Sequence, residues 1–158
     1  MTTSEAGVAE PLRQAMFERF VRDVEPRLRR ALVAAYGGQR GREATAEALS
    51  WAWENWDRVR TMEYPHRYLF RVGRSRTRAR RQRVVFDVSD AAEHHVEPRL
   101  GPALARLSER QRIAVVLVHG FGWTHREVAE LTGSRPTTVQ NHLERGLRKL
   151  RTDLEARL

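Results

Sequence analysis

Hydrophobic residues in the first quarter of the chain recur three and four positions apart. The pattern runs through Phe17, Phe20, Val21, Val24, Leu28, Leu32 and Ala35. Such spacing predicts a helix with one apolar face. Pro26 falls inside this pattern and should kink or divide the helix, and the sequence Tyr-Gly-Gly at 36–38 should end it.

Two more helices are predicted in the first half of the chain. One spans residues 42–57, and its residues Trp53 and Trp56 lie on one side, where they are expected to pack in the core. A loop then leads to Pro65, a residue suited to the first turn of a helix over 65–83. The chain has no alternating strand pattern and no internal repeat, so the predicted fold class is all-α.

Capping boxes mark the starts of two helices near the C-terminus. Ser108 is followed three residues later by Gln111, and Thr124 by Glu127. In this motif the hydroxyl and the longer side chain each bind a backbone N–H group of the first turn. A third helix is predicted from Pro136, and its apolar stripe consists of Val139, Leu143, Leu147, Leu150 and Leu154.

The last two of these helices are predicted to form a helix-turn-helix. Ala129 is small where crossing helices approach, and Gly133 suits the left-handed conformation of the turn. A packed helical hairpin with no DNA-binding role is the alternative. DNA binding is favoured because the outer face of the second helix carries short polar residues first and arginines later, as base edges and phosphates require. That face consists of Thr137, Thr138, Asn141, Arg145, Arg148 and Thr152.

The positive charge of the chain is high and consists almost wholly of arginine. The formal net charge is +9, the sequence pI is ≈ 11.2, and Lys149 is the only lysine. Because like charges at helical spacing disfavour an isolated helix, an anionic partner such as nucleic acid is expected for the arginine-rich segment 70–83. On a helix, five arginines would form one stripe: Arg67, Arg71, Arg74, Arg78 and Arg81.

Charge also divides the chain into three parts. Residues 1–83 carry 18 basic and 10 acidic side chains, residues 84–101 carry 1 and 4, and residues 102–158 carry 10 and 6. The middle part contains a proline and a glycine and is predicted to be an acidic linker. We therefore expect two small helical domains, at 10–83 and 102–158, preceded by an N-terminal tail at 1–9.

Several kinds of chemistry are excluded by the composition. Without cysteine there is no disulfide, no thiolate nucleophile and no cysteine zinc site, which suits a reducing compartment. The histidine spacings match no metal site, and no enzyme motif is present, so we expect neither a cofactor nor catalysis. The N-terminus lacks the pattern of a signal peptide and no apolar run could span a membrane, so a cytoplasmic, nucleoid-associated protein is expected.

Residues 107–151 resemble the C-terminal promoter-binding domain of bacterial sigma factors. The family pattern is Leu-Pro-x-Arg-Gln-Arg, an apolar stretch, a turn with Gly, then Glu-Ile-Ala and later Thr-Val. The matching residues here are Leu107, Arg110, Gln111, Arg112, Glu127, Val128, Ala129, Thr138 and Val139. LuxR-type regulators are the alternative, because residues 138–150 also suit them, although their stretch before the Glu is typically one residue shorter.

The N-terminal part resembles the other sigma domain, which grips core RNA polymerase and melts the promoter. Residues 47–56 are similar to the polymerase-binding helix, and residues 68–75 to the start of the promoter-melting helix. Ser75 stands where the family usually has Asn, and residues 43–46 lack its usual Asp-Leu-Val-Gln. Two such domains with a short linker are the layout of a small extracytoplasmic-function (ECF) sigma factor.

The resemblance implies three sets of site residues. Contacts to the minus-35 promoter element are expected from Arg135, Thr137, Thr138, Gln140, Asn141, His142, Arg145 and Arg148. Contacts to the melted minus-10 element are expected from Tyr64, Arg67, Tyr68, Arg71, Arg74, Ser75, Arg78 and Arg81. Polymerase contacts are expected from Glu43, Glu47, Ser50, Trp51 and Glu54.

The implied partners are core RNA polymerase, through its β′ clamp and β flap, and promoter DNA as duplex and as non-template single strand. An anti-sigma factor is a further candidate partner, and the acidic linker would thread the polymerase channel that later holds nascent RNA. Two other functions stay open. One is a stand-alone helix-turn-helix regulator that binds a duplex operator as a dimer, and the other is an RNA-binding protein that uses the arginine-rich helix.

Overall fold

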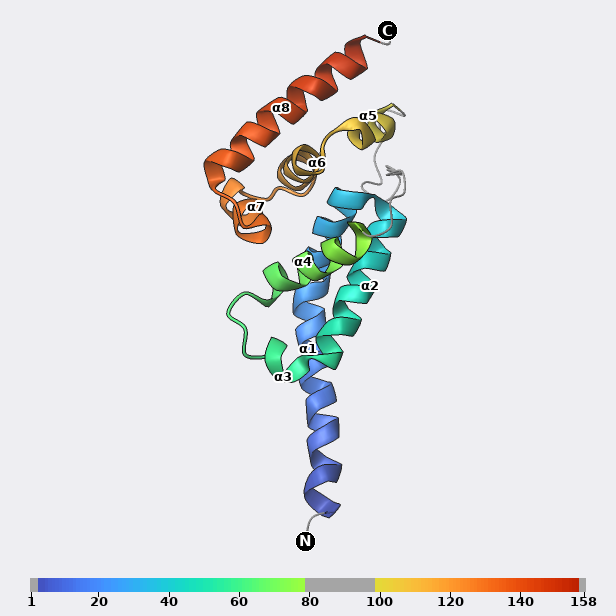
Figure 1. Cartoon of the computed structure of the whole chain (residues 1–158), viewed down its shortest axis with the longest axis vertical. Coiled ribbons are helices and arrows are strands. Elements are labelled where there is room, and N and C mark those ends of the chain that lie inside the picture. The colour runs from blue at the N-terminus through green and yellow to red at the C-terminus, as the bar shows by residue number, and fades with distance from the viewer. Residues whose placement is uncertain (1–2, 79–98, 157–158) are drawn as a thin grey trace.

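The computed structural model describes residues 3–78 and 99–156, and every regular element in these ranges is helical, which confirms the all-α class. The N-terminal domain contains α1 (Thr3–Tyr36), α2 (Gly38–Glu54), α3 (Trp56–Val59) and α4 (Pro65–Arg78). The C-terminal domain contains α5 (Leu100–Arg106), α6 (Glu109–Val115), a π-helical turn η2 (Val116–Gly120), α7 (His125–Thr132) and α8 (Pro136–Glu155) (Figure 1).

α1 is a single helix of 34 residues, and its N-terminal part projects beyond the rest of the molecule (Figure 1). Pro26 lies inside this helix and does not divide it, because Leu28 and Leu32 beyond the proline are fully buried and hold the following turns in place. Residues 3–9, which were expected to form a tail, are the first turns of α1. The helix ends at Tyr36, as predicted.

α2 packs closely against the C-terminal turns of α1. Gly37 adopts a φ of 88° and reverses the chain between the two helices. A Cβ atom added to Gly41 would lie 2.5 Å from the Cα of Val33, so the two backbones almost touch. The predicted helix over 42–57 is two helices: α2 begins four residues earlier and ends where the side-chain amide of Asn55 donates a 2.9 Å hydrogen bond to the carbonyl of Trp51.

The base of the N-terminal domain is an aromatic cluster between α1 and the end of α2 with α3. The ring of Phe17 lies 5.0 Å from Trp53 and 5.3 Å from Trp56, and the ring of Phe20 lies 5.1 Å from Trp56. Edge and tilted contacts at these distances are favourable between aromatic rings. Trp56 therefore packs in the core, as its spacing predicted, whereas Trp53 is half-buried and its ring lies 4.4 Å from the guanidinium of Arg13.

Both predicted capping boxes are present in the C-terminal domain. The hydroxyl of Ser108 accepts a 3.2 Å hydrogen bond from the N–H of Gln111, whose side chain accepts one of 3.2 Å from the N–H of Ser108. The Thr124 and Glu127 pair is equivalent, with distances of 3.1 and 2.9 Å. Helix α5 takes in residues 100–101, the last two of the expected linker, and residues 84–98 lie outside the described ranges.

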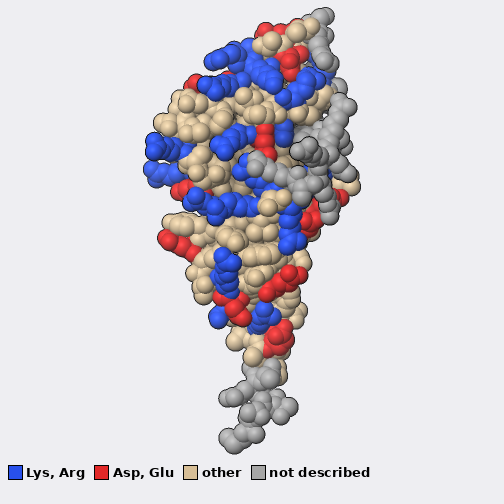
Figure 2. Space-filling model, in the orientation of Figure 1, with Lys and Arg blue, Asp and Glu red and all other residues tan. Residues whose placement is uncertain are grey.

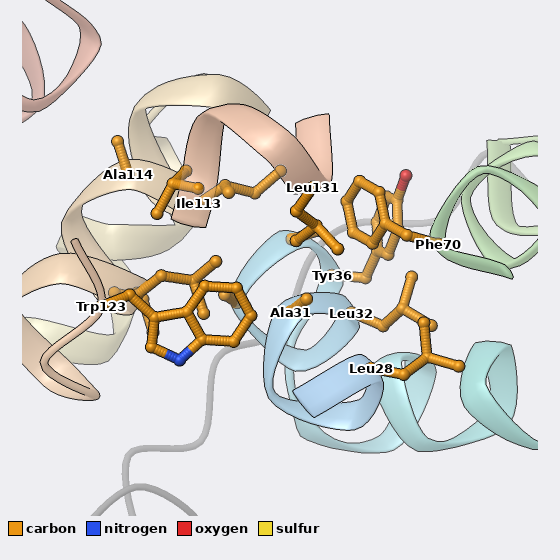
Figure 3. Packing of buried hydrophobic residues seen from close by; sticks show 14 of the residues in the cluster. Leu28, Ala31, Leu32, Tyr36, Phe70, Ile113, Ala114, Trp123 and Leu131 are labelled. Carbon is orange, nitrogen blue, oxygen red and sulfur yellow. The ribbon is translucent and has the colours of Figure 1, made fainter. Parts of the chain in front are cut away.

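The hydrophobic cores of the two domains meet. Figure 3 shows Trp123 and Leu131 of the C-terminal domain beside Ala31, Leu32 and Phe70 of the N-terminal domain. All five side chains are buried, and together they belong to one continuous cluster. Nothing in the sequence predicted this contact, because the apolar stripes of the separate helices do not say which helices face each other.

Basic side chains dominate one end of the molecular surface. Figure 2 shows Lys and Arg gathered over the wide part of the molecule, which holds α4 and the C-terminal domain, whereas acidic and basic side chains alternate over the projecting part of α1. None of the described helices has the length and apolar character needed to cross a membrane.

Candidate nucleic-acid interface

The backbone conformation of the turn fixes the arrangement of the two helices in the helix-turn-helix. Gly133 has a φ of 68°, the left-handed conformation that the sequence predicted. The N–H of Ser134 donates a 3.0 Å hydrogen bond to the carbonyl of Ala129, which ends α7. Ala129 and Val139 are buried between the two helices. The turn therefore holds α8 across α7 and leaves one side of α8 free of the domain core.

The free side of α8 carries most of the residues expected to contact the minus-35 element. Asn141, Arg145 and Arg148 are exposed along it, and Thr138 is half-buried at its first turn. The amide of Gln140 donates a 3.1 Å hydrogen bond to the carboxylate of Glu144, which orients that side chain at the edge of the face. The exposed members of the set are Arg135, Thr137, Gln140, Asn141, Arg145 and Arg148.

His142 departs from this arrangement. It lies on the flank of α8 and lines a hollow between the domains together with Phe70 and Arg74 of α4. Burial lowers the pKa of His142, and the positive charges of Arg110 and Arg145 lower it further. His142 therefore faces the N-terminal domain, whereas the other expected contacts of α8 face solvent.

A second polar surface is a shallow groove between α2 and α4. Its volume is about 320 Å³ and its floor is formed by Tyr68, whose ring lies 5.2 Å from the ring of Trp51. The guanidinium groups of Arg58 and Arg71 lie 5.2 and 5.7 Å from the centre of the Tyr68 ring. Cations over an aromatic face hold that ring in place and add positive charge to the groove.

The groove also contains the position that departs from the sigma pattern. Ser75 is exposed on α4 and lines the groove with Val72 and Arg76. A serine hydroxyl can donate and accept a hydrogen bond, but it is shorter than the Asn that the family usually carries. Tyr64 lies in the loop before α4 with 52% of its surface exposed, and a hydrogen bond with Glu63 together with the charge of that carboxylate raises the pKa of Tyr64.

The arginines of the α4 stripe differ in exposure and in the contacts that they already make within the protein. Arg71 is exposed beside the groove, whereas Arg74 forms a 2.6 Å ion pair with Glu109 of the C-terminal domain and has 20% of its side chain exposed. Arg67 is exposed, but its guanidinium lies against the turn of the helix-turn-helix at Gly133. Of the two remaining members, Arg78 is the last residue of α4, and Arg81 falls outside the described residues.

The residues expected to bind polymerase occupy one side of α2. Glu43, Ser50 and Glu54 are exposed, and Glu47 and Trp51 are half-buried. The opposite side of the helix is buried through the small residues Ala44, Ala48 and Ala52. Trp51 belongs to two surfaces, because it lies on this helix and also packs against Tyr68 in the groove.

Sequence reasoning missed Arg76, which lines the groove, and Arg58, which lies against the Tyr68 ring. Arg58 lies on α3, a short helix that was expected to be the end of a longer one, and its contact with Tyr68 depends on the bend at Asn55. Arg76 was counted in the basic segment but falls off the stripe that the helical spacing defined. Neither position carries a local sequence signal that could have placed it beside Tyr68.

Metal chemistry finds no support in the part of the chain that the structure describes. Within residues 3–78 and 99–156, no group of three or more His, Asp or Glu side chains is arranged to hold a metal ion. The polar residues that converge do so as arginines beside aromatic rings, which suits anionic and planar ligands.

Comparison with known proteins gives the same fold and a family for the C-terminal domain. Residues 99–150 match the family model described as sigma-70, region 4. A search of curated proteins gave no match. Among solved structures the chain is similar to one in the co-crystal structure of the sigma factor RpoE in complex with the anti-sigma factor NepR from Bartonella quintana. The TM-score is 0.59 at 21% identity, over 88% of this chain and 96% of that chain.

The family match covers the two capping boxes, the turn at Gly133 and the exposed face of α8. Residues 99–150 thus match sigma-70 region 4, and the chain as a whole has a fold similar to that of the sigma factor RpoE.

Proposed function

We propose that this protein is an alternative sigma factor that directs core RNA polymerase to a set of promoters. The exposed face of α8 carries the proposal, because it presents side chains for base edges and phosphates in a domain of the sigma-70 region 4 family. In this role Thr137, Thr138 and Asn141 enter the major groove of the minus-35 element. Arg145 and Arg148 bind phosphate groups farther along the helix.

The groove between α2 and α4 receives the melted minus-10 strand. A protein that opens DNA without ATP must bind the opened strand more tightly than the duplex. Stacking of a base on an aromatic side chain contributes about 1–3 kcal/mol. Tyr68 offers such a surface, and the exposed Arg71 lies within reach of the neighbouring phosphate. Tyr64, in the loop before α4, is available to a flipped base.

The exposed side of α2 binds core polymerase. Its acidic residues Glu43, Glu47 and Glu54 lie at spacings of four and seven, so they share one side of the helix. An acidic helix face suits a basic partner surface, which we place on the β′ clamp, and the C-terminal domain would meet the β flap. The usual Asp-Leu-Val-Gln is missing before Glu47, so this contact uses fewer of the family's residues.

An anti-sigma factor is a proposed regulatory partner. The structurally similar RpoE chain was crystallised with the anti-sigma factor NepR. A partner of that kind would inhibit this chain by covering the surfaces assigned to polymerase and promoter.

Run-off transcription with core polymerase tests the proposal. Purified protein plus core enzyme should yield transcripts from a cognate promoter, found by selecting active templates from a randomised promoter library. Tyr68→Ala should reduce open-complex formation by roughly tenfold, the effect of about 1.4 kcal/mol of lost stacking, whereas Tyr68→Phe keeps the ring and should retain most activity. If no template is transcribed and the protein alone binds a palindromic duplex as a dimer, it is a stand-alone regulator.

A further inference from the structure

Arginine side chains surround a hollow between α1, α2 and the loop that follows η2. Its volume is about 290 Å³, and it is lined by Arg29, Arg30 and Val33 of α1, Arg42 of α2 and Phe121 of the loop. The three arginines are exposed, and Val33 and Phe121 are half-buried. None of these five residues belongs to the surfaces assigned to promoter or polymerase, so the proposed function does not use this arginine hollow.

The close approach of α1 and α2 brings arginines of both helices to the arginine hollow. Val33 follows Arg29 by four residues and Arg30 by three, so these side chains share one side of α1. At Val33 the backbones of the two helices almost touch, because Gly41 has no Cβ atom. Arg42 is the next residue of α2 and is thereby placed beside the arginines of α1. The cluster therefore depends on helix packing and not on a local sequence motif.

Backbone hydrogen bonds fix the loop that carries Phe121. The N–H of Phe121 donates a 3.1 Å hydrogen bond to the carbonyl of Val116, five residues earlier, which is the pairing of a π-helical turn. The N–H of Trp123 donates a 2.9 Å hydrogen bond to the carbonyl of Leu117, and the indole of Trp123 is buried in the core (Figure 3). The Phe121 ring is thus held at the arginine hollow by contacts on both sides of it in the sequence.

Arg30 has an aromatic neighbour but no acidic partner within residues 3–78 and 99–156. Its guanidinium lies 5.5 Å from the centre of the Phe121 ring, and no carboxylate of the described residues is paired with it. Arg27, one turn earlier on α1, shows the contrast. Its guanidinium lies 4.5 Å from the ring centre of Trp123 and also 3.6 Å from the carboxylate of Glu127. The charge of Arg27 is compensated within the protein, whereas that of Arg30 is directed toward the arginine hollow.

Positive charge exceeds negative charge around the arginine hollow. The Nε of Arg29 lies 3.1 Å from the carboxylate of Glu25, but a guanidinium also carries N–H donors on its two terminal nitrogens. Three guanidinium groups that line one small volume repel one another, and a bound anion with several charges reverses the sign of this electrostatic energy. The arrangement therefore favours a small ligand of high negative charge.

The side chains of the arginine hollow define the chemistry of that ligand. The planar fork of a guanidinium bonds two phosphate oxygens at once, and an aromatic ring beside it suits a stacked base. A nucleic-acid strand spaces its charges along the backbone, one per nucleotide. A nucleoside polyphosphate instead concentrates them within a few ångströms, as arginines around one hollow require. The volume of about 290 Å³ is close to the lower end of the range for small-molecule sites.

We propose that the arginine hollow binds a nucleoside polyphosphate. The base stacks on the exposed part of the Phe121 ring, and Arg29, Arg30 and Arg42 hold the phosphate chain. The ligand contacts α1, α2 and the loop after η2, so its binding stabilises the folded chain by mass action. This site is separate from the surfaces proposed for DNA and polymerase, and its occupation requires neither partner.

Isothermal titration calorimetry of the full chain with ATP and with GTP, in EDTA, tests the site. Inorganic tripolyphosphate, which has the phosphate chain without a base, is the comparison probe. At least one of the nucleotides should bind roughly tenfold more tightly than tripolyphosphate, because its base stacks on Phe121. No binding of either nucleotide, or affinities equal to that of tripolyphosphate, would overturn the proposal.

Two variants locate the nucleotide in the arginine hollow. Arg30→Gln should weaken nucleotide and tripolyphosphate binding by about tenfold, because a charge-assisted hydrogen bond to phosphate is lost. Phe121→Leu should weaken nucleotide binding by about tenfold and leave tripolyphosphate binding as it is in the parent, whereas Phe121→Tyr keeps the ring and should retain nucleotide affinity. Equal effects of Phe121→Leu on both ligands would overturn the assignment of a base to this ring.

Arg22→Gln is the matched control for charge. Arg22 is also an exposed arginine of α1, two turns before Arg30, and it does not line the arginine hollow. This variant makes the same charge change and should weaken nucleotide binding by about twofold or less, because salt screens exposed charges. Equal losses in Arg22→Gln and Arg30→Gln would show a diffuse attraction to the basic surface and would overturn the site.

A labelled single-stranded oligonucleotide distinguishes the nucleotide site from a nucleic-acid surface. Its affinity should fall slightly, and by the same factor, in Arg30→Gln and Arg22→Gln, since each variant removes one positive charge. A loss in Arg30→Gln as large as that for the nucleotide would assign the arginine hollow to a nucleic-acid strand and overturn the proposal. These measurements need neither polymerase nor promoter, so failure of transcription would overturn the proposed function and leave the nucleotide site in place.

Discussion

The guanidinium of Arg112 in α6 bonds to the carbonyl oxygen of Ala35, 77 residues earlier in the chain and in the last turn of α1. The same guanidinium donates a 2.9 Å hydrogen bond to the carbonyl of Leu107 within its own domain. Arg112 was matched to the second arginine of the sigma motif, and burial lowers its pKa. The Arg112 side chain thus stabilises the first turns of the C-terminal domain and links them to the end of α1 in the N-terminal domain.

Arg112→Met should destabilise the protein by about 2–3 kcal/mol, because it leaves buried carbonyl oxygens of Ala35 and Leu107 without a charged donor. Urea unfolding monitored by circular dichroism measures the change. Lys149→Met is the control, since Lys149 also donates to a carbonyl, that of Arg106, but in an exposed position. The control should change stability by about 0.5 kcal/mol or less. Equal losses in the two variants would mean that Arg112 is an ordinary surface contact.

Gly41→Ala should destabilise the N-terminal domain by about 1–3 kcal/mol, because its Cβ would overlap the backbone of Val33 where α1 and α2 are closest. Gly7→Ala is the matched change in open space, and nothing lies within 4 Å of its added Cβ. Alanine favours a helix, so this control should be neutral or stabilising by up to about 1 kcal/mol. Thermal unfolding of both variants measures the change in stability. A stabilised Gly41→Ala protein would contradict the close packing of α1 and α2.

Asn141→Ala and Arg148→Ala should affect DNA binding in different ways. Asn141 is exposed near the start of α8, so its loss should relax sequence preference at one position, by about 1–3 kcal/mol for the preferred base. Arg148 lies farther along the same face, so its loss should weaken binding to all sequences alike. Binding to a library of minus-35 variants separates the two effects. Identical specificity profiles in the parent and Asn141→Ala would remove Asn141 from base readout.

Arg71→Gln should lower the salt dependence of binding to single-stranded DNA. Each phosphate contact contributes about 0.7 to the slope of log affinity against log salt for a single strand. Arg71 lies exposed beside Tyr68, so the slope should fall by about that amount. Arg60→Gln serves as control, because Arg60 is also exposed and pairs with Asp57 at 3.4 Å outside the groove. A slope unchanged by Arg71→Gln would show that this arginine does not bind phosphate.

Acidification should destabilise the contact between α4 and α7 through His66. Burial lowers the pKa of His66, the charge of Arg27 lowers it further, and Glu130 opposes part of that shift. The unfolded chain therefore binds more protons below the ordinary histidine pKa of about 6.5, so stability present above this pH is lost as pH falls toward the lowered pKa. Unfolding free energy of the parent should fall over this range more steeply than that of His66→Gln. Superimposable pH profiles of the two proteins would contradict a role of His66 in this loss of stability. The lowered pKa of His142 affects the stability of both proteins in the same direction.

Local signals in the sequence predicted the helices and the helix-turn-helix. Ser108 and Thr124 indicate helix starts because a capping box involves only residues three apart. Gly133 indicates a turn because the left-handed backbone conformation disfavours residues with a side chain. The spacing of Val139 and Leu143 defines the buried side of α8, and thereby the face left exposed. These features are decided within a few residues and can be read from sequence.

Only the tertiary structure determined which side chains of different helices contact one another. The bend at Asn55 places Arg58 beside Tyr68. At the interface between the two domains, Arg74 forms an ion pair with Glu109, and His142 lies away from the exposed side of α8. Each of these contacts joins residues from different helices, and helical periodicity gives the direction of a side chain only relative to its own helix. Composition alone indicated an anionic partner for the arginines of α4, but only the packed chain shows that one of them already has an acidic partner within the protein.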